Sequence, residues 1–294
     1  MGKKIGVVGI PGRWSSELLA DRLEERTGFR LLLSSEDISL HLESQDGRAN
    51  GRSLAELDGL IIKKIGPDYS HYILDRVEVL RTVHRQGLQM FPSPETIARA
   101  VNRLSCTAEL RSAGVPIPET VITESVETAH RTVQEFGQAV FKPLFTSKAR
   151  GMMVFEAGRT AHGEIKGYQE AGNPVMYIQK RVEIPGYDLG VVFLGGKHLA
   201  TYARVGKEDS WNTTTVFGGR YAPHEPSPEV LAVARKAQSV FDLDFASVDI
   251  AETPNGPVVF EVSAFGGFRG LKETHGIDAA KLYADLVVDR VCEG

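Results

Sequence analysis

The first third of the chain alternates apolar runs of strand length with amphipathic segments of helical length. The run KKIGVVGIPG, at residues 3–12, has the pattern of a buried strand that ends in a Gly/Pro turn. Helical spacing follows over residues 15–27, and further strand-like runs occupy residues 29–33 and 59–65. Strands that alternate with helices predict a parallel sheet and an α/β fold in this part of the chain.

Ser-Pro pairs mark the starts of two later helices. Ser93 is placed to cap a helix in which Pro94 takes the first position, and Gly114 stands where this helix should end. A second Ser-Pro pair predicts a helix over residues 227–241. Apolar residues at helical spacing predict a final helix from near Asp278, whose simplest role is packing.

The composition indicates a folded protein of more than one subdomain. The chain has 294 residues, of which 42% are hydrophobic, so we expect two or three subdomains with real cores. The net charge of −4, without a basic stripe, argues against a nucleic-acid partner. Cys106 and Cys292 are too far apart for a disulfide framework or a metal motif, which favours the reducing cytoplasm.

The first apolar run excludes several simple alternatives. Residues 5–10 are too short for a signal peptide, and no run in the chain approaches the length that spans a bilayer, so we expect a soluble protein that does not bind a membrane. Gly6, Gly9 and Gly12 do not follow the G-x-G-x-x-G spacing of dinucleotide-binding strands. The sequence therefore argues against NAD binding.

Two acids stand among strand-forming residues in DIAETPNGPVVFEVSAFGG, at residues 249–267. If residues 254–256 form a three-residue hairpin loop, counting outward sets Asp249 opposite Glu261, about 5 Å away. Ser263 points to the same face because side chains alternate along a strand. Two carboxylates this close repel unless a cation lies between them, and Mg²⁺ is the simplest candidate. The alternative is that both acids are solvated on an exposed face.

Lys142 stands inside the strand-like run AVFKPLF, where an unpaired ammonium is costly to bury. We therefore expect an anion beside it; the alternative is a lysine that reaches the sheet edge. The loop FTSKARGMM follows and adds Lys148 and Arg150 to the hydroxyls of Thr146 and Ser147. This set is able to close over phosphates, although a basic loop is also often only solvated.

Further polar residues follow a second strand-like run, VMYIQKRVE. Arg204 and Lys207 precede WNTTTVFGG, a polar loop at residues 211–219. The order of these features resembles that of the ATP-grasp superfamily. Nearly the whole chain is similar to the RimK-like branch of α-L-glutamate ligases that modify ribosomal protein S6, and to the related cofactor and amino-group-carrier ligases. The motifs that carry the resemblance, in order, are LDGLIIKKIG, AGVPIPET, VFKP, IQKRVEIPGYDL, ASVDI, VVFEVSAFGG and THGIDAA.

The resemblance implies an ATP-grasp fold of mixed α/β (α+β) class. A Rossmann-like pre-ATP-grasp domain is expected at residues 1–95. The central ATP-grasp subdomain is expected at residues 96–183 and the C-terminal subdomain at residues 184–294, with the nucleotide enclosed between these two α+β subdomains.

The resemblance also implies roles for individual residues. Lys142 would hold ATP phosphates, and Asp188 would face the ribose. Asp249 and Glu261, with Ser263, would bind Mg²⁺, with Mn²⁺ as an alternative. The backbone of a strand segment would hydrogen-bond adenine, and its residues are Gln179, Lys180, Arg181 and Val182. Arg103 and Asn212 are expected to make two further nucleotide contacts. Three catalytic cations are also expected, and they are Lys148, Arg150 and Arg204.

The chain departs from the family's pattern at several of these positions. Ser263 replaces an asparagine metal ligand, and Gly190 replaces an arginine. The other replacements are Asn212 for arginine, Thr214 for asparagine, Arg103 for lysine, and Thr146 and Ala149 for loop glycines. Cations that would compensate are Lys148, Arg150, Arg204 and Lys207. A less conventional branch, such as the ATP-grasp protein of the three-gene GAK system, fits these departures.

The resemblance implies a Mg-ATP-dependent carboxylate–amine ligase that forms an amide or peptide bond through an acyl phosphate. Its partners would be small carboxylate and amine substrates, with glutamate as an example, or a protein or peptide acceptor, and the protein would be a homo-oligomer. Two alternatives are an ATP-binding regulatory protein without turnover and an ATP-dependent phosphotransferase. Candidates for the acceptor pocket, with packing as the alternative for the aromatic residues, are Tyr69, His71, Phe268 and Arg269.

Overall fold

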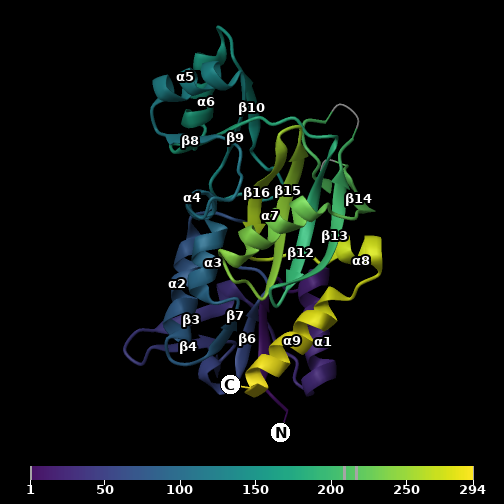
Figure 1. Ribbon diagram of the computed structural model, residues 1–294. Coiled ribbons are helices and arrows are strands. Elements are labelled where there is room, and N and C mark those ends of the chain that lie inside the picture. Colours follow the sequence, from purple (N-terminus) through teal and green to yellow (C-terminus); the bar gives the residue numbers. More distant parts are fainter. Residues whose placement is uncertain (1, 208–209, 216–217, 294) are drawn as a thin grey trace.

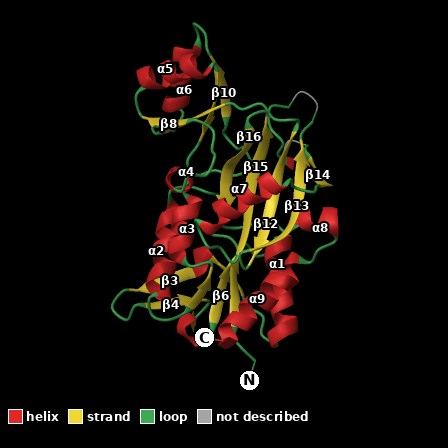
Figure 2. Cartoon of the chain, viewed as in Figure 1, coloured by secondary structure: helices red, strands yellow, loops and turns green. Residues whose placement is uncertain are grey.

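The computed structural model describes residues 2–207, 210–215 and 218–293. Figure 1 shows the first and last parts of the chain packed together, with the central part at one end of the molecule. Figure 2 shows that helices and strands are mixed throughout, as expected for the predicted α/β (α+β) class. None of the described helices is both long enough and apolar enough to cross a membrane.

A four-stranded sheet forms the N-terminal part, and it is parallel, as predicted. Its strand order is β2-β1-β6-β7, with each neighbouring pair parallel. All residues of β1 are buried, as is usual for a strand covered on both faces. The elements are β1 (Ile5–Gly9), α1 (Trp14–Thr27), β2 (Leu32–Ser34), β6 (Gly59–Ile62), α2 (Tyr72–His84) and β7 (Gln89–Phe91).

No apolar run predicts the small antiparallel sheet that lies between β2 and β6 in the sequence. Its strand order is β3-β4-β5. The strands are short and mostly polar, so their sequence lacks the alternation that marks a half-buried strand. The elements are η1 (Ser35–Asp37), β3 (Ile38–His41), β4 (Asp46–Ala49), β5 (Arg52–Ser53) and η2 (Leu54–Glu56).

The helix predicted to begin at Ser93 is divided in two, so the prediction of a single helix was wrong. Ser93 caps the first part as expected. Asn102 then leaves helical geometry, with φ −80° and ψ 114°, and its side chain accepts hydrogen bonds from two amides of the next helix. Asparagine is a strong N-cap. The two helices are α3 (Pro94–Val101) and α4 (Arg103–Ser112).

The central part forms an antiparallel sheet of order β10-β9-β11-β8, against which two helices pack (Figure 1). It has its own hydrophobic core, in which the rings of Phe155 and Tyr168 contact Phe141 with centroids 4.5 and 5.4 Å away. The elements are β8 (Thr120–Thr123), α5 (Val126–Phe136), β9 (Gln138–Lys142), β10 (Met153–Glu156), α6 (Ala161–Glu170) and β11 (Met176–Lys180).

The C-terminal part is a five-stranded antiparallel sheet of order β14-β13-β12-β15-β16. One helix, α7, packs against β15 and β16, and α8 packs against β13 and β14. The elements are β12 (Tyr187–Leu194), β13 (Lys197–Val205), β14 (Arg220–Pro223), α7 (Pro228–Ser239), β15 (Phe245–Thr253), β16 (Gly256–Ser263), α8 (Arg269–His275) and α9 (Ala279–Glu293).

The N-terminal and C-terminal parts share hydrophobic cores. Ile62 of β6 belongs to the same buried cluster as Val248 of β15. The final helix α9 packs on α1, and Tyr283 donates a hydrogen bond from its hydroxyl to the carbonyl of Phe91 at 3.0 Å. The division at residues 95 and 183 falls between the three main sheets. It stays a prediction, since the first and third parts are joined by common cores.

Candidate active site

A cavity of about 800 Å³ lies between the central and C-terminal sheets, within the size range of small-molecule sites. Its walls come from β9, β11 and the loop after β9 on one side and from β12, β13, β15 and β16 on the other. Every nucleotide-binding, metal-binding or catalytic residue that the family resemblance implies lines it, except Arg150. These residues are Arg103, Lys142, Lys148, Gln179, Lys180, Arg181, Val182, Asp188, Arg204, Asn212, Asp249, Glu261 and Ser263.

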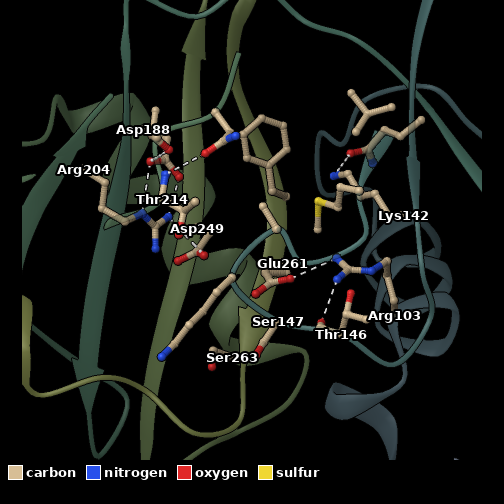
Figure 3. Close-up of a pocket in the computed structure, with 18 of the residues that line it drawn as sticks. Arg103, Lys142, Thr146, Ser147, Asp188, Arg204, Thr214, Asp249, Glu261 and Ser263 are labelled. Carbon is tan, nitrogen blue, oxygen red and sulfur yellow. Dashed lines mark hydrogen bonds and ion pairs between the residues drawn. The ribbon is translucent and has the colours of Figure 1, made fainter. Parts of the chain in front are cut away.

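The β15–β16 hairpin sets Asp249 directly opposite Glu261, as the sequence predicts, but by a different route. The predicted three-residue loop was wrong, because Thr253 pairs with Gly256 and leaves a loop of only two residues. A β-bulge at Phe260 then adds one residue to β16 and restores the predicted register. Figure 3 shows both carboxyl groups on the cavity side of the hairpin.

Arg204 lies between two acids from neighbouring strands. Its Nε donates to Asp188 Oδ1 at 3.1 Å, its Nη2 also binds Asp188, and Nη2 lies 3.0 Å from Asp249 Oδ2. Thr213 Oγ1 donates to Asp188 Oδ1 at 2.6 Å. Burial raises the pKa of Asp249 to about 7, with Glu261 and Asp188 adding to the rise and Arg204 opposing it. One arginine therefore does not fully offset this acidic cluster.

Glu261 has a different arginine as its partner. Arg103 is the first residue of α4, and its Nη1 lies 3.1 Å from Glu261 Oε2. The same guanidinium donates to the carbonyls of Pro143 and Thr146 at 3.2 and 3.0 Å. Arg103 is buried, whereas the side chain of Glu261 is 41% exposed to the cavity. Arg103 thus ties the loop after β9 to the acidic hairpin.

The donors around the hairpin suit a hard cation, although the described residues contain no cluster of three or more acidic, histidine or cysteine ligands. Asp249 and Glu261 are opposed, and Ser263 is paired with Ser247, whose hydroxyl lies 3.5 Å from Asp249 Oδ1. Carboxylate and hydroxyl oxygens are the type of ligand that Mg²⁺ takes. Burial, together with Glu261 and Asp188, raises the pKa of Asp249, so a cation beside this carboxyl group would stabilise its charged form.

Lys142 is buried and has an amide as its partner. Its Nζ donates to Gln179 Oε1, and it lies 5.1 Å from the centroid of the Phe260 ring. Among the described residues, no carboxylate forms an ion pair with it. Burial lowers its pKa to about 7, an effect that Arg103 reinforces and Glu261 opposes. The structure gives Lys142 an amide as its partner, and the anion expected beside it stays a prediction.

The Gln179 side chain is held by a hydrogen-bond network that the sequence does not reveal. Its Nε2 donates to Thr120 Oγ1 at 3.1 Å and to the Tyr177 hydroxyl at 3.2 Å. The Tyr177 hydroxyl is in turn 2.8 Å from Thr107 Oγ1 on α4. This network fixes the amide that binds Lys142.

The segment predicted to bind adenine leaves β11 at the cavity. The amides of Lys180 and Arg181 already donate to the carbonyls of Glu119 and Gln138, at 2.8 and 3.0 Å. Val182 follows the strand and lines the cavity, and the contact of this segment with adenine stays a prediction.

Two residues other than glycine adopt positive φ angles in the loop after β9. Lys148 and Ala149 have φ of 60° and 56°, a region that residues other than glycine seldom adopt. Lys148 lines the cavity. Arg150 does not, because its guanidinium turns outward to Asp68, with Nη1 3.3 Å from Oδ1. The structure does not bring Arg150 into the wall where the sequence analysis expected it.

The ring of Tyr202 lies where a side chain at position 190 would be, which accounts for the glycine at that position. Tyr202 pairs with Gly190 across β12 and β13, and a methyl group at position 190 would lie 2.5 Å from Cζ of Tyr202. The ring therefore covers the glycine and takes the space of a side chain. Asn212 lines the cavity and accepts a hydrogen bond at Oδ1 from the Thr214 amide at 3.2 Å. Residues 216–217 of this polar loop lie outside the described residues.

Only some of the residues predicted for an acceptor pocket line the cavity. Tyr69 lines the cavity, and burial raises its pKa, with Glu261 adding to the rise. Phe268 is only 1% exposed and packs on Phe245 in the core, so its packing role prevails. Arg269 is exposed and pairs with Glu273, and His71 lies outside the cavity wall. Lys64, which the sequence analysis did not select, lines the cavity from the N-terminal sheet.

Comparison with known proteins identifies the family. Residues 100–287 match the RimK-like ATP-grasp domain. The chain belongs to the RimK-like ATP-grasp family. The predicted fold and the predicted class of ATP-dependent carboxylate–amine ligase are thereby confirmed at the level of the family.

Two relatives illustrate the similarity of this RimK-like chain to curated proteins. It is 28% identical to the tetrahydromethanopterin:α-L-glutamate ligase of Methanosarcina acetivorans, over 95% of this chain and 97% of that protein. It is 30% identical to a probable α-L-glutamate ligase of Thioalkalivibrio sulfidiphilus, over 78% and 76%.

Solved structures agree with this RimK-like fold. The ATP-grasp ligase PsnB, in complex with a phosphomimetic variant of its minimal precursor, Mg and ADP, superposes with a TM-score of 0.76 at 20% identity, covering 99% of both chains. A RimK domain ATP-grasp protein from Sphaerobacter thermophilus has a TM-score of 0.72 at 18% identity, covering 97% of this chain and 99% of that one.

Proposed function

We propose that this RimK-like protein is a Mg²⁺-dependent ligase that uses ATP to join a carboxylate to the amine of an amino acid such as glutamate. The observation that carries the proposal is a buried lysine, Lys142, that has no acid partner among the described residues and lies in the same cavity as the opposed acids Asp249 and Glu261. A cationic group and a cation site facing one cavity suit a nucleoside triphosphate. The relatives named as α-L-glutamate ligases support glutamate as the amine.

The residues take the following roles in the proposal. Lys142 binds phosphate oxygens in place of the side-chain amide oxygen of Gln179, and Asp188 faces the ribose. The backbone of Val182 meets the adenine. Asn212 lies along the nucleotide, and Arg204 supplies a cation near the transferring phosphoryl group. Arg150 has no role here, because it lies outside the cavity wall.

The proposed reaction has two steps. A carboxylate oxygen of the first substrate attacks the γ-phosphorus of ATP, the bond from that phosphorus to the β,γ-bridging oxygen breaks, and ADP leaves with the electron pair. The amine of the second substrate attacks the acyl carbon, phosphate leaves, and the amine proton passes to solvent. The first step brings an anionic carboxylate to an anionic phosphoryl group, and the second step releases anionic phosphate, so positioned cations lower both barriers.

Mg²⁺ would be held by Asp249, Glu261 and Ser263 and would offset charge on the ATP phosphates, and Mn²⁺ is an alternative with the same ligands. A neighbouring solved structure that contains Mg and ADP supports this choice. Arg103 and Arg204 hold the two carboxylates in place when no cation is bound. Homo-oligomerisation and a cytoplasmic location are further parts of the proposal.

Release of ADP, followed with L-glutamate and a peptide that ends in glutamate, tests the proposal. ADP should require Mg²⁺ and both substrates, and the mass of the peptide should increase by one glutamate residue. Glu261→Gln should abolish this turnover, whereas Glu164→Gln, a matched change at an exposed position of α6, should not. Unchanged turnover in Glu261→Gln would overturn the assignment.

Two other outcomes would favour the remaining candidates. Tight Mg-ATP binding without ADP release, across a panel of carboxylates and amines, would support a regulatory nucleotide-binding protein. The replacement of a family arginine by Gly190, covered by Tyr202, is the observation in favour of this candidate. A product heavier by a phosphoryl group and not by an amino acid would support a phosphotransferase.

A further inference from the structure

One row of paired residues in the C-terminal sheet contains the two opposed acids and a tyrosine. Asp249 of β15 pairs with Glu261 of β16 on one side and with Gly190 of β12 on the other. Gly190 in turn pairs with Tyr202 of β13. Residues that pair directly across strands direct their side chains to the same face of the sheet. Tyr202 therefore shares the face of both acids, and it lines the cavity.

The ring of Tyr202 leans across β12 in the direction of these acids. A methyl group at position 190 would lie 2.5 Å from Cζ and 2.8 Å from the hydroxyl oxygen of Tyr202, so the hydroxyl end of the ring lies over Gly190. The next strand in this direction is β15, which carries Asp249. The hydroxyl group thus lies on the side of the row where the acids are.

The ring fits between two glycines, which fixes its orientation. Gly270 of α8 approaches the edge away from Gly190, where a methyl group would lie 2.6 Å from Cε1 of Tyr202. Neither glycine has a positive φ, so what both provide is room for the ring. Tyr221 contacts the same ring edge-on, with the centroids 5.2 Å apart. A group that is already held in place loses little conformational entropy when it binds a ligand.

The hydroxyl group of Tyr202 is an uncharged donor near neutral pH. Burial raises the pKa of Tyr202 to about 12, an effect that Arg204 and Ser247 oppose and Asp249 reinforces. The phenol therefore keeps its proton and donates a hydrogen bond. Arg204 lies two residues along β13 on the same face and places a positive charge beside this donor. A donor next to a cation suits an anionic ligand.

The strand register indicates which part of a nucleotide this donor would meet. In the proposed function Asp188 faces the ribose, and Asp188 pairs with Arg204 in the row next to that of Tyr202 on this face. The row of Tyr202 contains Asp249 and Glu261, which would hold Mg²⁺ on the phosphates. A nucleotide that extends from the ribose position to the cation site therefore brings its phosphates level with the tyrosine.

We propose that the hydroxyl group of Tyr202 donates a hydrogen bond to the terminal phosphoryl group of ATP and keeps this bond while the phosphoryl group moves to the substrate carboxylate. The inference rests on the proposed ligase function and adds a catalytic residue to it. The phenol takes the place of the arginine that the RimK-like pattern has at position 190, so an uncharged donor replaces a charged one. No proton is transferred from the phenol in either step.

Calorimetric binding of two nucleotides to the full chain tests this role without turnover. Tyr202→Phe keeps the ring between the two glycines and removes only the hydroxyl group. It should weaken binding of the ATP analogue AMPPNP with Mg²⁺ by about tenfold, as for loss of one hydrogen bond to a charged group. The affinity for Mg-ADP, which lacks the terminal phosphoryl group, should not change, and this also shows that the variant is folded.

Tyr168→Phe is the matched control for loss of a buried hydroxyl group. The hydroxyl of Tyr168 has no hydrogen-bond partner among the described residues, and this tyrosine lies outside the cavity wall. The control variant should bind both nucleotides with the affinity of the wild type.

The outcomes separate this role from the proposed function. A wild-type protein that binds neither nucleotide overturns both proposals. If the wild type binds both nucleotides and Tyr202→Phe binds Mg-AMPPNP equally well, the role of Tyr202 alone is overturned. Equal weakening of Mg-AMPPNP and Mg-ADP in the variant also overturns it, because the hydroxyl group would then support the whole site and not meet the terminal phosphoryl group.

The ADP-release assay of the proposed function provides a second readout. Because the hydrogen bond is kept in the transition state, Tyr202→Phe should lower kcat/KM for ATP by at least about tenfold. Tyr168→Phe should leave this value unchanged. Equal kcat/KM in Tyr202→Phe and the wild type would overturn the assignment.

Discussion

Arg204 Nη2 lies 3.0 Å from Asp249 Oδ2, and the same guanidinium binds Asp188 on the adjacent side. The acid that the hairpin directs into the cavity therefore has a counter-ion from the protein itself. Burial nevertheless raises the pKa of Asp249 to about 7, an effect that Arg204 opposes only in part. The arginine thus fixes the positions of both acids at the cavity wall.

Replacement of this arginine should be destabilising. Arg204→Met leaves Asp188 and Asp249 buried without their cation, and the expected loss of unfolding free energy is about 3–5 kcal/mol. Urea denaturation measures the loss. Mg²⁺ should restore part of it, because the ion replaces the guanidinium beside Asp249. Arg131→Met, on an exposed position of α5, is the matched control, and an equal loss in both variants would contradict the prediction.

Lys142 should make stability depend on pH in a defined window. Its pKa is about 7 in the folded protein and near its usual value of 10.5 when unfolded, so the unfolded state binds more protons between these values. Stability from this group therefore rises with pH across the window, by at most about 1.4 kcal/mol per pH unit. Lys142→Met removes the buried charge, so it should be more stable than the wild type at pH 7.

The advantage of Lys142→Met should shrink as the pH rises towards and beyond 10.5, where the lysine becomes neutral in the unfolded state as well as in the folded state. Guanidinium denaturation at several pH values measures the difference, and Lys166→Met controls for loss of a surface lysine. Gln179 loses a partner in the variant, which reduces the gain by about 1–3 kcal/mol. A difference between Lys142→Met and the wild type that is constant with pH would exclude a buried, charged lysine.

The register of the acidic hairpin shows which features of the site can be predicted from the sequence and which cannot. Pairing of Asp249 with Glu261 follows from a count that assumed a three-residue loop, whereas the molecule uses a two-residue loop and a bulge at Phe260. Local turn preferences do not reveal the bulge, which lies several residues away from the turn. The predicted pairing of Asp249 with Glu261 was therefore correct, because the shorter loop and the bulge shift the register by one residue in opposite directions.

Other parts of the site depend on contacts between distant segments. The helix break at Asn102 places Arg103 beside Glu261, 158 residues later in the chain, and no local pattern indicates this pair. The role of Tyr202 is similarly hidden, because it depends on the strand opposite Gly190. Motif order located the cavity residues, but the arginine partners of the acids required the three-dimensional structure.

The contact between Gly190 and Tyr202 makes a steric prediction. A methyl group at position 190 would lie 2.5 Å from the tyrosine ring, so Gly190→Ala should lower the free energy of unfolding by about 1–3 kcal/mol, the usual range for overpacking. Gly158→Ala is the matched control, because a methyl group there meets no atom within 4 Å. Thermal and urea denaturation compare the two variants. Equal stability would show that the ring moves freely.

Substitution of Ser263 should change how strongly the hairpin binds a divalent cation. Its hydroxyl belongs to the face that carries Asp249 and Glu261, in the position where the RimK-like pattern has an asparagine. An amide carbonyl reaches further and is a stronger ligand than a hydroxyl, so Ser263→Asn should lower the Mg²⁺ concentration needed for ATP binding. Ser263→Ala should raise it by about tenfold, the lower end of the effects seen when a group that supports a metal is removed.

Calorimetric titration of ATP at a series of Mg²⁺ concentrations separates these effects, since it requires no acceptor and no turnover. Ser239→Ala, at an exposed position that ends α7, is the control for loss of a hydroxyl. Ser263→Asn should require the lowest Mg²⁺ concentration for ATP binding, the wild type a higher one, and Ser263→Ala the highest. If all three proteins require the same Mg²⁺ concentration, the hydroxyl is not a ligand, and the cation site consists of Asp249 and Glu261 with oxygens from the nucleotide and solvent.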